Sequence, residues 1–318
     1  MGHAIFTRMR NTVTWVFLAA ALASGCSVRK YAINKLGDAL AHSGSTFASD
    51  DDPELVRQAV PFSLKLIESL IAESPRHPGL LLAAARGFTQ YAYAFVQQPA
   101  EELESKDLAA SRELCDRARR LYLRARNYGL RGLEARHPGF DQALRAHPTA
   151  AVNALRKEEL PMIYWTAASW AAAIALSKDH PEVVADFPLV EALADRALAL
   201  DEAYEAGALH TFMMTFELAR KGAPGDPMAR VKRHFDRAME LAQGAQAGPL
   251  VSWAENVSVQ RQNVGEFKSM LNRALAVDPN SRPEWRLENL VLQRRARWLL
   301  SRIDELFLVL DSNEEKAK

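Results

Sequence analysis

Cysteine, net charge and helix-breaking residues are all scarce in this sequence. Only two of its 318 residues are cysteine, which excludes a disulfide scaffold. Lys and Arg number 40 against 39 Asp and Glu, so the formal net charge is +1. That balance excludes a strongly basic nucleic-acid-binding protein. Gly and Pro number 15 each, too few for a collagen-like or low-complexity chain.

Motifs that carry known catalytic or cofactor chemistry are also absent from the sequence. There is no G-x-x-x-x-G-K-[ST] loop, no G-x-G-x-x-G, no G-x-S-x-G and no H-E-x-x-H. No two histidines lie three or four residues apart, as a metal site on one helix face would require. We therefore expect a protein that is not an enzyme, with no catalytic residues, no cofactor, no metal and no nucleic-acid partner.

The N-terminus has the order of features found in exported bacterial lipoproteins. Arg8 and Arg10 precede an uncharged, mostly apolar run from Val13 to Ala23. This run is shorter than the roughly 20 residues that a membrane-spanning helix needs, and it fits the apolar region of a signal peptide. Small residues then lead into Cys26, an arrangement that resembles the bacterial lipobox.

This resemblance predicts that residues 1–25 are removed and that Cys26 is acylated. The acyl chains would anchor residues 26–318, a single helical domain, to a membrane. Ser27, rather than Asp, follows the cysteine, which favours the outer membrane. The alternatives are an ordinary exported protein and a short anchor that stays attached.

The rest of the chain has the composition and periodicity of an all-α protein. Good helix formers dominate it, and no sustained alternation typical of strands is present. Apolar residues recur at helical spacing, as at Leu193, Ala197 and Leu200, and such stripes must pack on neighbouring helices. The predicted helices are 27–41, 54–73, 79–97, 107–135, 139–146, 149–156, 159–177, 188–200, 203–220, 227–243, 248–259, 264–276 and 284–310.

Weak internal repetition indicates how these helices are organised. The spacing of Leu271, Ala274 and Pro279 fits the second helix and closing proline of a tetratricopeptide repeat, and Phe235 with Ala238 fits part of it. Such repeats are helical hairpins of about 34 residues, whereas the spacings here are irregular. We predict a degenerate tetratricopeptide-like helical-repeat array of about 12–13 helices. The alternative is a non-repetitive α bundle, which would lack the extended concave surface of an array.

Aromatic residues provide the best candidates for a binding site. Tyr164, Trp165 and Trp170 lie in one alanine-rich helix. Because residues five apart diverge by about 140° around a helix, the two tryptophans cannot both face one core seam. With His210 and Trp253 they form our candidate ligand or partner cavity. Core packing is the alternative for each of them.

Four dispersed stretches resemble one protein family. The family is the T component associated with TRAP transporters (TatT), whose members are tetratricopeptide-like lipoproteins. The lipobox and the chain length also agree. The stretches are MIYWTAASWAAAIALSKD at 162–179, RALALDEAYEAGALHTF at 196–212, HFDRAMEL at 234–241 and RLENLVLQRRARWLLSRIDELF at 286–307. Members usually have Leu-Gly after Gly-Ala-Leu-His, but this chain has Phe212-Met213-Met214, which is expected to alter a local turn or a cavity wall.

The resemblance implies a periplasmic, lipid-anchored protein that docks a periplasmic solute-binding protein of the TRAP type. A small, apolar ligand would pass between the two through a groove or pore, and the chain would form a homo-oligomer, specifically a homotrimer. The resemblance to the family implies no catalytic residues. The alternative function is a helical-repeat scaffold lipoprotein in an envelope-assembly complex.

Overall fold

The computed structural model describes residues 35, 37, 39 and 44–308. The predicted signal peptide at 1–25, the predicted lipidation site Cys26 and all but three residues of the helix predicted at 27–41 lie outside these residues.

The described part of the chain is all-α, as the composition predicts, and no strand occurs in it. None of its helices combines the length and the apolarity that crossing a bilayer would require. The elements are α2 (Gly44–Ala48), α3 (Pro53–Glu73), α4 (Pro78–Ala92), η1 (Tyr93–Gln97), α5 (Gln98–Leu103), α6 (Leu108–Arg136), α7 (Phe140–Ala146), α8 (Pro148–Asn153), η2 (Lys157–Glu159), α9 (Leu160–Ala175), α10 (Pro181–Val184), α11 (Phe187–Leu200), η3 (Tyr204–Ala206), α12 (Ala208–Ala219), α13 (Pro227–Ala242), α14 (Gly248–Trp253), η4 (Ala254–Ser258), α15 (Val264–Leu275), η5 (Pro283–Trp285), α16 (Arg286–Leu300) and α17 (Ile303–Leu306).

Two of the predicted helices are wrong as continuous elements. The helix predicted at 203–220 is divided into η3 and α12, because Gly207 adopts a left-handed φ of 98° between them. The helix predicted at 284–310 is divided into η5, α16 and α17. Its break follows Leu300, where the Ser301 hydroxyl donates to the Trp298 carbonyl at 2.7 Å. The short helices α2, α5 and α10 are missed by the sequence pattern.

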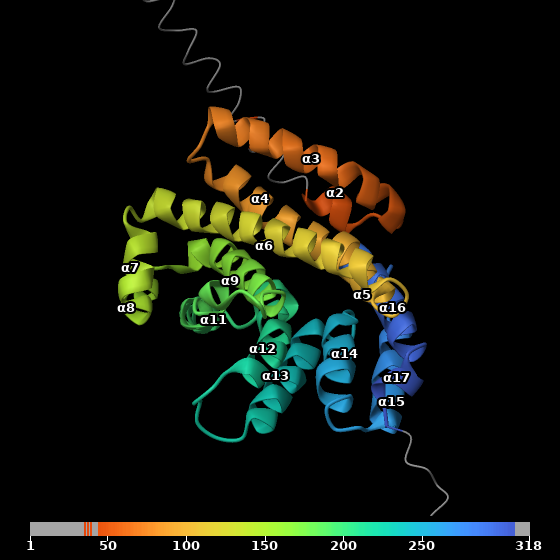
Figure 1. Ribbon diagram of the computed structural model, residues 1–318. Helices are drawn as coiled ribbons and strands as arrows, with labels where there is room; N and C mark the ends of the chain where they lie inside the picture. Colours follow the sequence, from red (N-terminus) through yellow and green to blue (C-terminus); the bar gives the residue numbers. More distant parts are fainter. Residues whose placement is uncertain (1–34, 36, 38, 40–43, 309–318) are drawn as a thin grey trace, which may run out of the picture.

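The helices form a curved array with an inner and an outer layer (Figure 1). The inner helices α4, α9, α12, α14 and α16 contact one another in that order. The outer helices α3, α6, α11, α13 and α15 pack between or beside them. Helix α16 then contacts α2 and α3 at the opposite end of the chain, so that the array closes into a ring. The prediction of a helical-repeat fold is confirmed.

Polar contacts join the two ends of the array where the ring closes. Arg286 Nη1 donates to the Ser49 carbonyl at 2.9 Å. In the middle of α16, Arg294 Nη2 lies 2.7 Å from Glu102 Oε2 of α5. The neighbouring Arg295 pairs with Glu101. The last long helix is therefore tied to the first part of the described chain.

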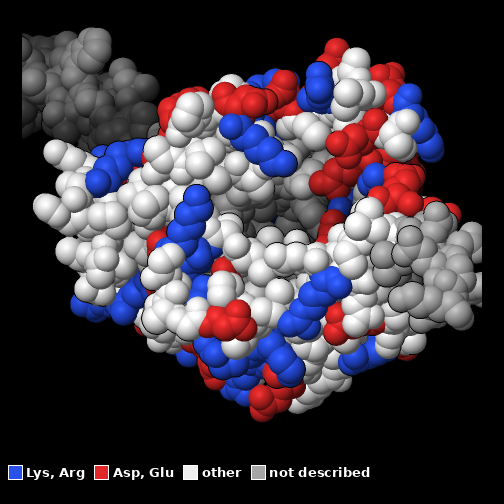
Figure 2. All heavy atoms as spheres, turned by 60° about the horizontal axis from the view of Figure 1, so that its bottom comes forward, with Lys and Arg blue, Asp and Glu red and all other residues white. Residues whose placement is uncertain are grey.

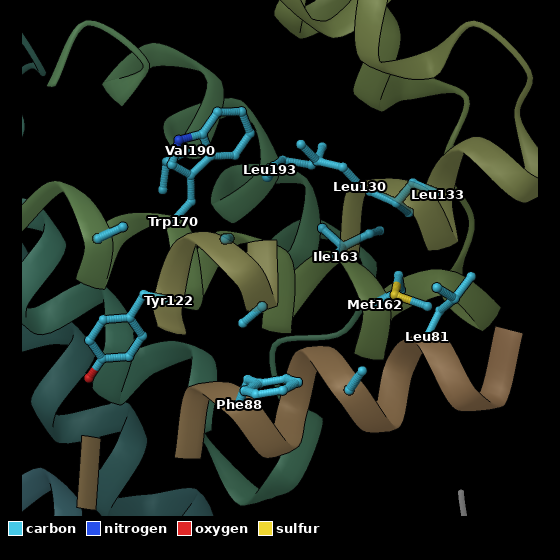
Figure 3. Close-up of a cluster of buried hydrophobic side chains, with 14 of the residues drawn as sticks. Leu81, Phe88, Tyr122, Leu130, Leu133, Met162, Ile163, Trp170, Val190 and Leu193 are labelled. Carbon is cyan, nitrogen blue, oxygen red and sulfur yellow. The ribbon is translucent and has the colours of Figure 1, made fainter. Parts of the chain in front are cut away.

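The core consists of two hydrophobic clusters that meet at α12. The larger cluster lies among α3, α4, α6, α9, α11 and part of α12, and the smaller one among α12 to α16. Figure 3 shows part of the larger cluster, in which Phe88 of α4, Ile163 of α9 and Leu193 of α11 come from different helices. The close contact of α6 with α9 depends on glycine: a Cβ at Gly129 would lie 2.1 Å from Thr166 Oγ1.

Candidate functional site

The ring surrounds a central hollow, which Figure 2 shows as a deep depression with acidic side chains along one side of its rim. The inner helix α4 lines it along one face. Arg86, Gln90 and Tyr93 share that face because they are four and three residues apart. Gln90 and Tyr93 are exposed, and Arg86 is partly exposed, although α4 packs within the ring. These side chains therefore face a space that solvent can enter.

Glu288 of α16 lies against the inner helix α14. Its side chain is accessible to solvent, and its Oε1 lies 3.7 Å from the position that a Cβ at Gly248 would take. Desolvation raises the pKa of its carboxyl to about 7, and the nearby Glu205 charge raises it further while Arg86 opposes the shift. This packing places Glu288 on the inner side of the ring.

Aromatic rings from three elements gather beside Glu288. The ring centroid of Tyr164 lies 4.9 Å from that of Trp165, 5.5 Å from that of Tyr204 and 6.5 Å from that of Phe212. Desolvation raises the pKa of the Tyr164 hydroxyl, and the Glu205 and Glu288 charges add to the shift. The phenols therefore stay protonated at physiological pH and can donate hydrogen bonds.

Arg86 faces this aromatic group from α4. Its guanidinium carbon lies 5.6 Å from the centroid of the Trp165 ring, a cation–π arrangement. Its Nε is buried and has no hydrogen-bond partner. Within the described residues no ion pair joins Arg86 to a carboxylate, although Glu288 lies close enough for its pKa to respond to the arginine charge. We call the set Arg86, Tyr164, Trp165, Tyr204, Glu205, Phe212 and Glu288 the Arg86 wall.

The segment that supplies Tyr204 and Glu205 has a strained backbone. Glu205 and Ala206 have φ values of 43° and 53°, and Gly207 follows at 98°. Left-handed conformations are unfavourable for residues with a Cβ, and they cluster at binding sites where the surrounding structure imposes them. This strain places Glu205 beside the aromatic rings of the Arg86 wall.

A second polar group, the Arg295 cluster, lies further along the same inner helices. Two π-helical turns, η1 and η4, carry its members Tyr93 and Glu255. Such turns are frequent at functional sites. Arg295 is buried and pairs with both Glu255 and Glu101, and its guanidinium carbon lies 4.4 Å from the centroid of Trp298. Although burial opposes it, the two carboxylates raise the arginine pKa, so this cation is already neutralised within the protein.

The five residues of the predicted cavity do not lie together. Tyr164 and Trp165 share the Arg86 wall, where Tyr164 is partly exposed and Trp165 is buried. Trp170 is fully buried in the larger core cluster, with the guanidinium of Arg126 5.0 Å from its ring. Trp253 is buried in the smaller cluster, where its ring lies 4.6 Å from that of Phe235.

His210 is buried between α12 and α13, where it meets a second histidine. His210 Nδ1 lies 2.8 Å from His234 Nδ1, and His210 Nε2 lies 3.4 Å from Glu202 Oε2. Desolvation, assisted by the His210 charge, lowers the pKa of His234 to about 4. One imidazole therefore donates to the other, and the pair joins two helices. Among the described residues no group of three or more His, Cys, Asp or Glu side chains is arranged as a metal site.

Sequence reasoning missed the charged members of the Arg86 wall. Arg86, Glu205 and Glu288 each occur alone in helical sequence, where a single charge is typical of a solvated face. For two of these three residues the sequence did hold a clue to their importance. Glu205 and Glu288 lie in the stretches 196–212 and 286–307, which carry the family resemblance. Phe212, the first residue of the departure from the family pattern, does line the wall.

The fold and the wall define a class: an all-α ring that surrounds a hollow with aromatic and ionisable groups on its inner face. A family model described as TRAP transporter T-component matches residues 49–307, and the chain belongs to this family. A protein of Treponema pallidum (strain Nichols) that is named only as uncharacterized is 30% identical over 314 residues, which cover 92% of this chain and 97% of that protein. Family membership gives the chain a role in TRAP transport, in association with other components of such transporters.

Proposed function

We propose that this protein is a non-enzymatic periplasmic lipoprotein that docks a TRAP-type solute-binding protein and passes a small ligand through its hollow. The observation that carries the proposal is the hollow that Figure 2 shows, together with the partly exposed rings of the Arg86 wall. Ligand sites are concave, mostly apolar and furnished with a few polar groups, and the Arg86 wall has this composition. The ligand presents an apolar surface to the partly exposed rings of Tyr164, Tyr204 and Phe212.

Anchoring and assembly complete the proposal. Acyl chains on Cys26 hold the protein at a membrane, and Ser27 favours the outer membrane. The chain forms a homo-oligomer, a trimer by resemblance to the family. An apolar stripe on the outer helix α3 supports association, since Leu55 is 56% and Phe62 74% exposed there. Apolar side chains exposed to this extent on one helix face mark contact surfaces.

The test is recovery of partners from the native membrane. The full lipoprotein is crosslinked in its own cells, extracted in detergent and captured, and its partners are identified by mass spectrometry. We expect a periplasmic solute-binding protein in amounts comparable to the captured chain. Recovery of envelope-assembly proteins without a solute-binding protein would replace the transport role with that of an envelope scaffold.

A further inference from the structure

Building on the proposed passage of a ligand through the hollow, we propose that the Arg86 wall binds a small zwitterion. Arg86 takes the ligand's carboxylate, and Glu205 and Glu288 take its ammonium group. The ligand's apolar side chain lies on the aromatic rings of the wall. The ligand is thus of the amino-acid type rather than a simple hydrocarbon or a simple acid.

The opposite charges of the wall do not neutralise one another. Arg86 acts electrostatically on Glu288, so the two groups are near. No ion pair joins Arg86 to Glu205 or Glu288 in the part of the chain described, and Arg86 Nε has no partner. Elsewhere in the same ring the charge of Arg295 is paired with Glu101 and Glu255. The separated charges of the Arg86 wall leave a gap that a ligand with both charges can bridge.

Ligands with a single charge or none do not match the charges of the wall. An anion would gain from Arg86 but would be repelled by Glu205 and Glu288 on the facing elements. A wholly apolar ligand would displace water from all three charged groups and give them nothing in return, which is costly. A zwitterion matches both signs, and each contact would be a charge-assisted hydrogen bond.

The neutral part of the ligand meets the aromatic rings of the wall. Tyr164 and Tyr204 are partly exposed and present ring faces and phenol hydroxyls beside the carboxylates, and the buried Trp165 ring packs against Tyr164. Aromatic faces next to carboxylates attract ammonium groups as well as apolar side chains. The strained backbone at Glu205 holds its carboxylate against these rings before any ligand arrives. The wall is therefore preorganised for a ligand with an ammonium group next to an apolar side chain.

Proton exchange distinguishes the zwitterion from an anion. The pKa of Glu288 stands at about 7, and its charged neighbours are Glu205 of η3 and Arg86 of α4, with the Tyr164 and Tyr204 phenols also close. An ammonium group beside it favours the carboxylate form, so binding at pH 7 releases a proton. An anion bound at the same place would have the opposite effect, and binding would take up a proton.

The experiment uses the full chain in detergent micelles. The twenty protein amino acids are screened singly at 10 mM by thermal shift. The best binder is then titrated by calorimetry at pH 7 in buffers of different ionisation enthalpy. Its two singly charged analogues, the amine without the carboxylate and the acid without the ammonium group, are titrated in parallel. We expect binding of the zwitterion with proton release and affinity at least tenfold weaker for either analogue.

Three variants assign the contacts. Arg86→Gln is expected to weaken binding of the zwitterion at least tenfold while leaving the amine analogue unchanged. Glu288→Gln is expected to weaken the zwitterion, to leave the acid analogue unchanged and to abolish the proton release. Glu113→Gln, on an exposed position of α6, is the control and should bind like the wild type. Circular dichroism checks that every variant remains helical.

Contrary outcomes separate this proposal from the proposed function. If no amino acid shifts the melting temperature, or if the acid analogue binds as well as the zwitterion with proton uptake, the zwitterion site is wrong. A solute-binding protein recovered from membranes would still support the transport role in that case. If amino acids bind as described but no such partner is recovered, the site stands and the docking role fails.

Discussion

Individual charged side chains determine what the hollow can bind. Arg86 and Arg295 have the same chemistry and both face the inner side of the ring, yet only Arg295 has carboxylate partners. An arginine paired with carboxylates of its own protein serves structure, whereas a partly exposed arginine without such a pair is available to a ligand's carboxylate. Glu288 adds a carboxyl group that is half protonated near neutral pH.

Protonation of Glu288 is expected to couple folding stability to pH. Its pKa in the folded protein, about 7, lies above its model value of 4.5. The folded state thus binds the proton more tightly, and the associated stability is full below pH 4.5 and is lost as pH rises through 7. Because glutamine cannot lose a proton, Glu288→Gln should gain about 1 kcal/mol of unfolding free energy over the wild type at pH 8, after allowance for screening by water in the hollow.

Urea unfolding at pH 5 and pH 8 measures this difference. At pH 5 the difference should be much smaller, since the folded wild-type carboxyl is then protonated and only the unfolded form is partly ionised. Glu113→Gln should be neutral at both pH values. An identical pH dependence for Glu288→Gln and the wild type would mean that the carboxyl is solvated as on an open surface.

Helices and their joints account for how the wall is assembled. The periodicity of apolar residues predicts most of the long helices to within a few residues, because burial of one face determines where each must run. The breaks and irregular turns between helices cannot be predicted from the spacing of apolar residues. They are the left-handed Gly207 and the π-helical turns at Tyr93–Gln97 and Ala254–Ser258. These exceptions supply Glu205, Tyr93 and Glu255, and periodicity alone predicts the helices without placing these polar side chains relative to one another.

The contact between α6 and α9 should be intolerant of one added methyl group. A Cβ at Gly129 would lie 2.1 Å from Thr166 Oγ1 and 3.2 Å from the Thr166 Cα. Gly129→Ala gains up to about 1 kcal/mol of helix propensity but forces two packed helices apart, so we expect a net loss of about 2 kcal/mol in unfolding free energy. Chemical denaturation measures it.

Two further variants show whether the loss comes from the contact with Thr166. Gly265→Ala, on α15, meets nothing closer than 3.6 Å and should be neutral or stabilising. Adding Thr166→Ala to Gly129→Ala should restore part of the lost stability, because the clashing hydroxyl is gone. Equal effects of Gly129→Ala and Gly265→Ala would show that close packing of α6 and α9 is not the constraint.

At the scale of the whole molecule, closure of the ring is the feature that creates a hollow. It depends on contacts between α16 and residues about 190 to 240 positions earlier in the chain, such as Arg294 with Glu102 and Arg286 with Ser49. The local spacing of apolar residues cannot predict a contact between residues so far apart in the sequence. Composition and repeat pattern could therefore predict a helical array with a concave surface, whereas the closed ring and the meeting of Arg86, Glu205 and Glu288 required the structure.

Removing one buried side chain from the contacts that close the ring should destabilise the ring. Arg295→Met keeps the side-chain length but leaves Glu101 and Glu255 without their cation. We expect a loss of about 3 kcal/mol in unfolding free energy and faster amide hydrogen exchange in α2 and α16. Arg294→Met removes a more exposed pair and should cost less than about 1 kcal/mol. Similar effects of the two variants would contradict the role assigned to Arg295.

Self-association is expected to use the exposed stripe on α3. Phe62, 74% exposed, is the most prominent apolar residue of that helix. Placing a charge there opposes burial at an interface, so Phe62→Glu should shift the full lipoprotein in detergent from oligomer to monomer in sedimentation velocity. Gln142→Glu, at an exposed polar position of the different helix α7, should leave the oligomer intact. A wild-type protein that sediments as a monomer would remove the basis for the proposed trimer.

The central claim is that the ring carries a small ligand in its hollow, and native mass spectrometry tests it most directly. The full lipoprotein is extracted gently from its own membranes and weighed intact. We predict one small-molecule adduct per chain, greatly reduced in Tyr164→Ala and Trp165→Ala but retained in Trp285→Ala, whose ring stacks on Arg282 outside the Arg86 wall. An adduct of equal abundance in all three variants, or none in the wild type, would contradict the claim.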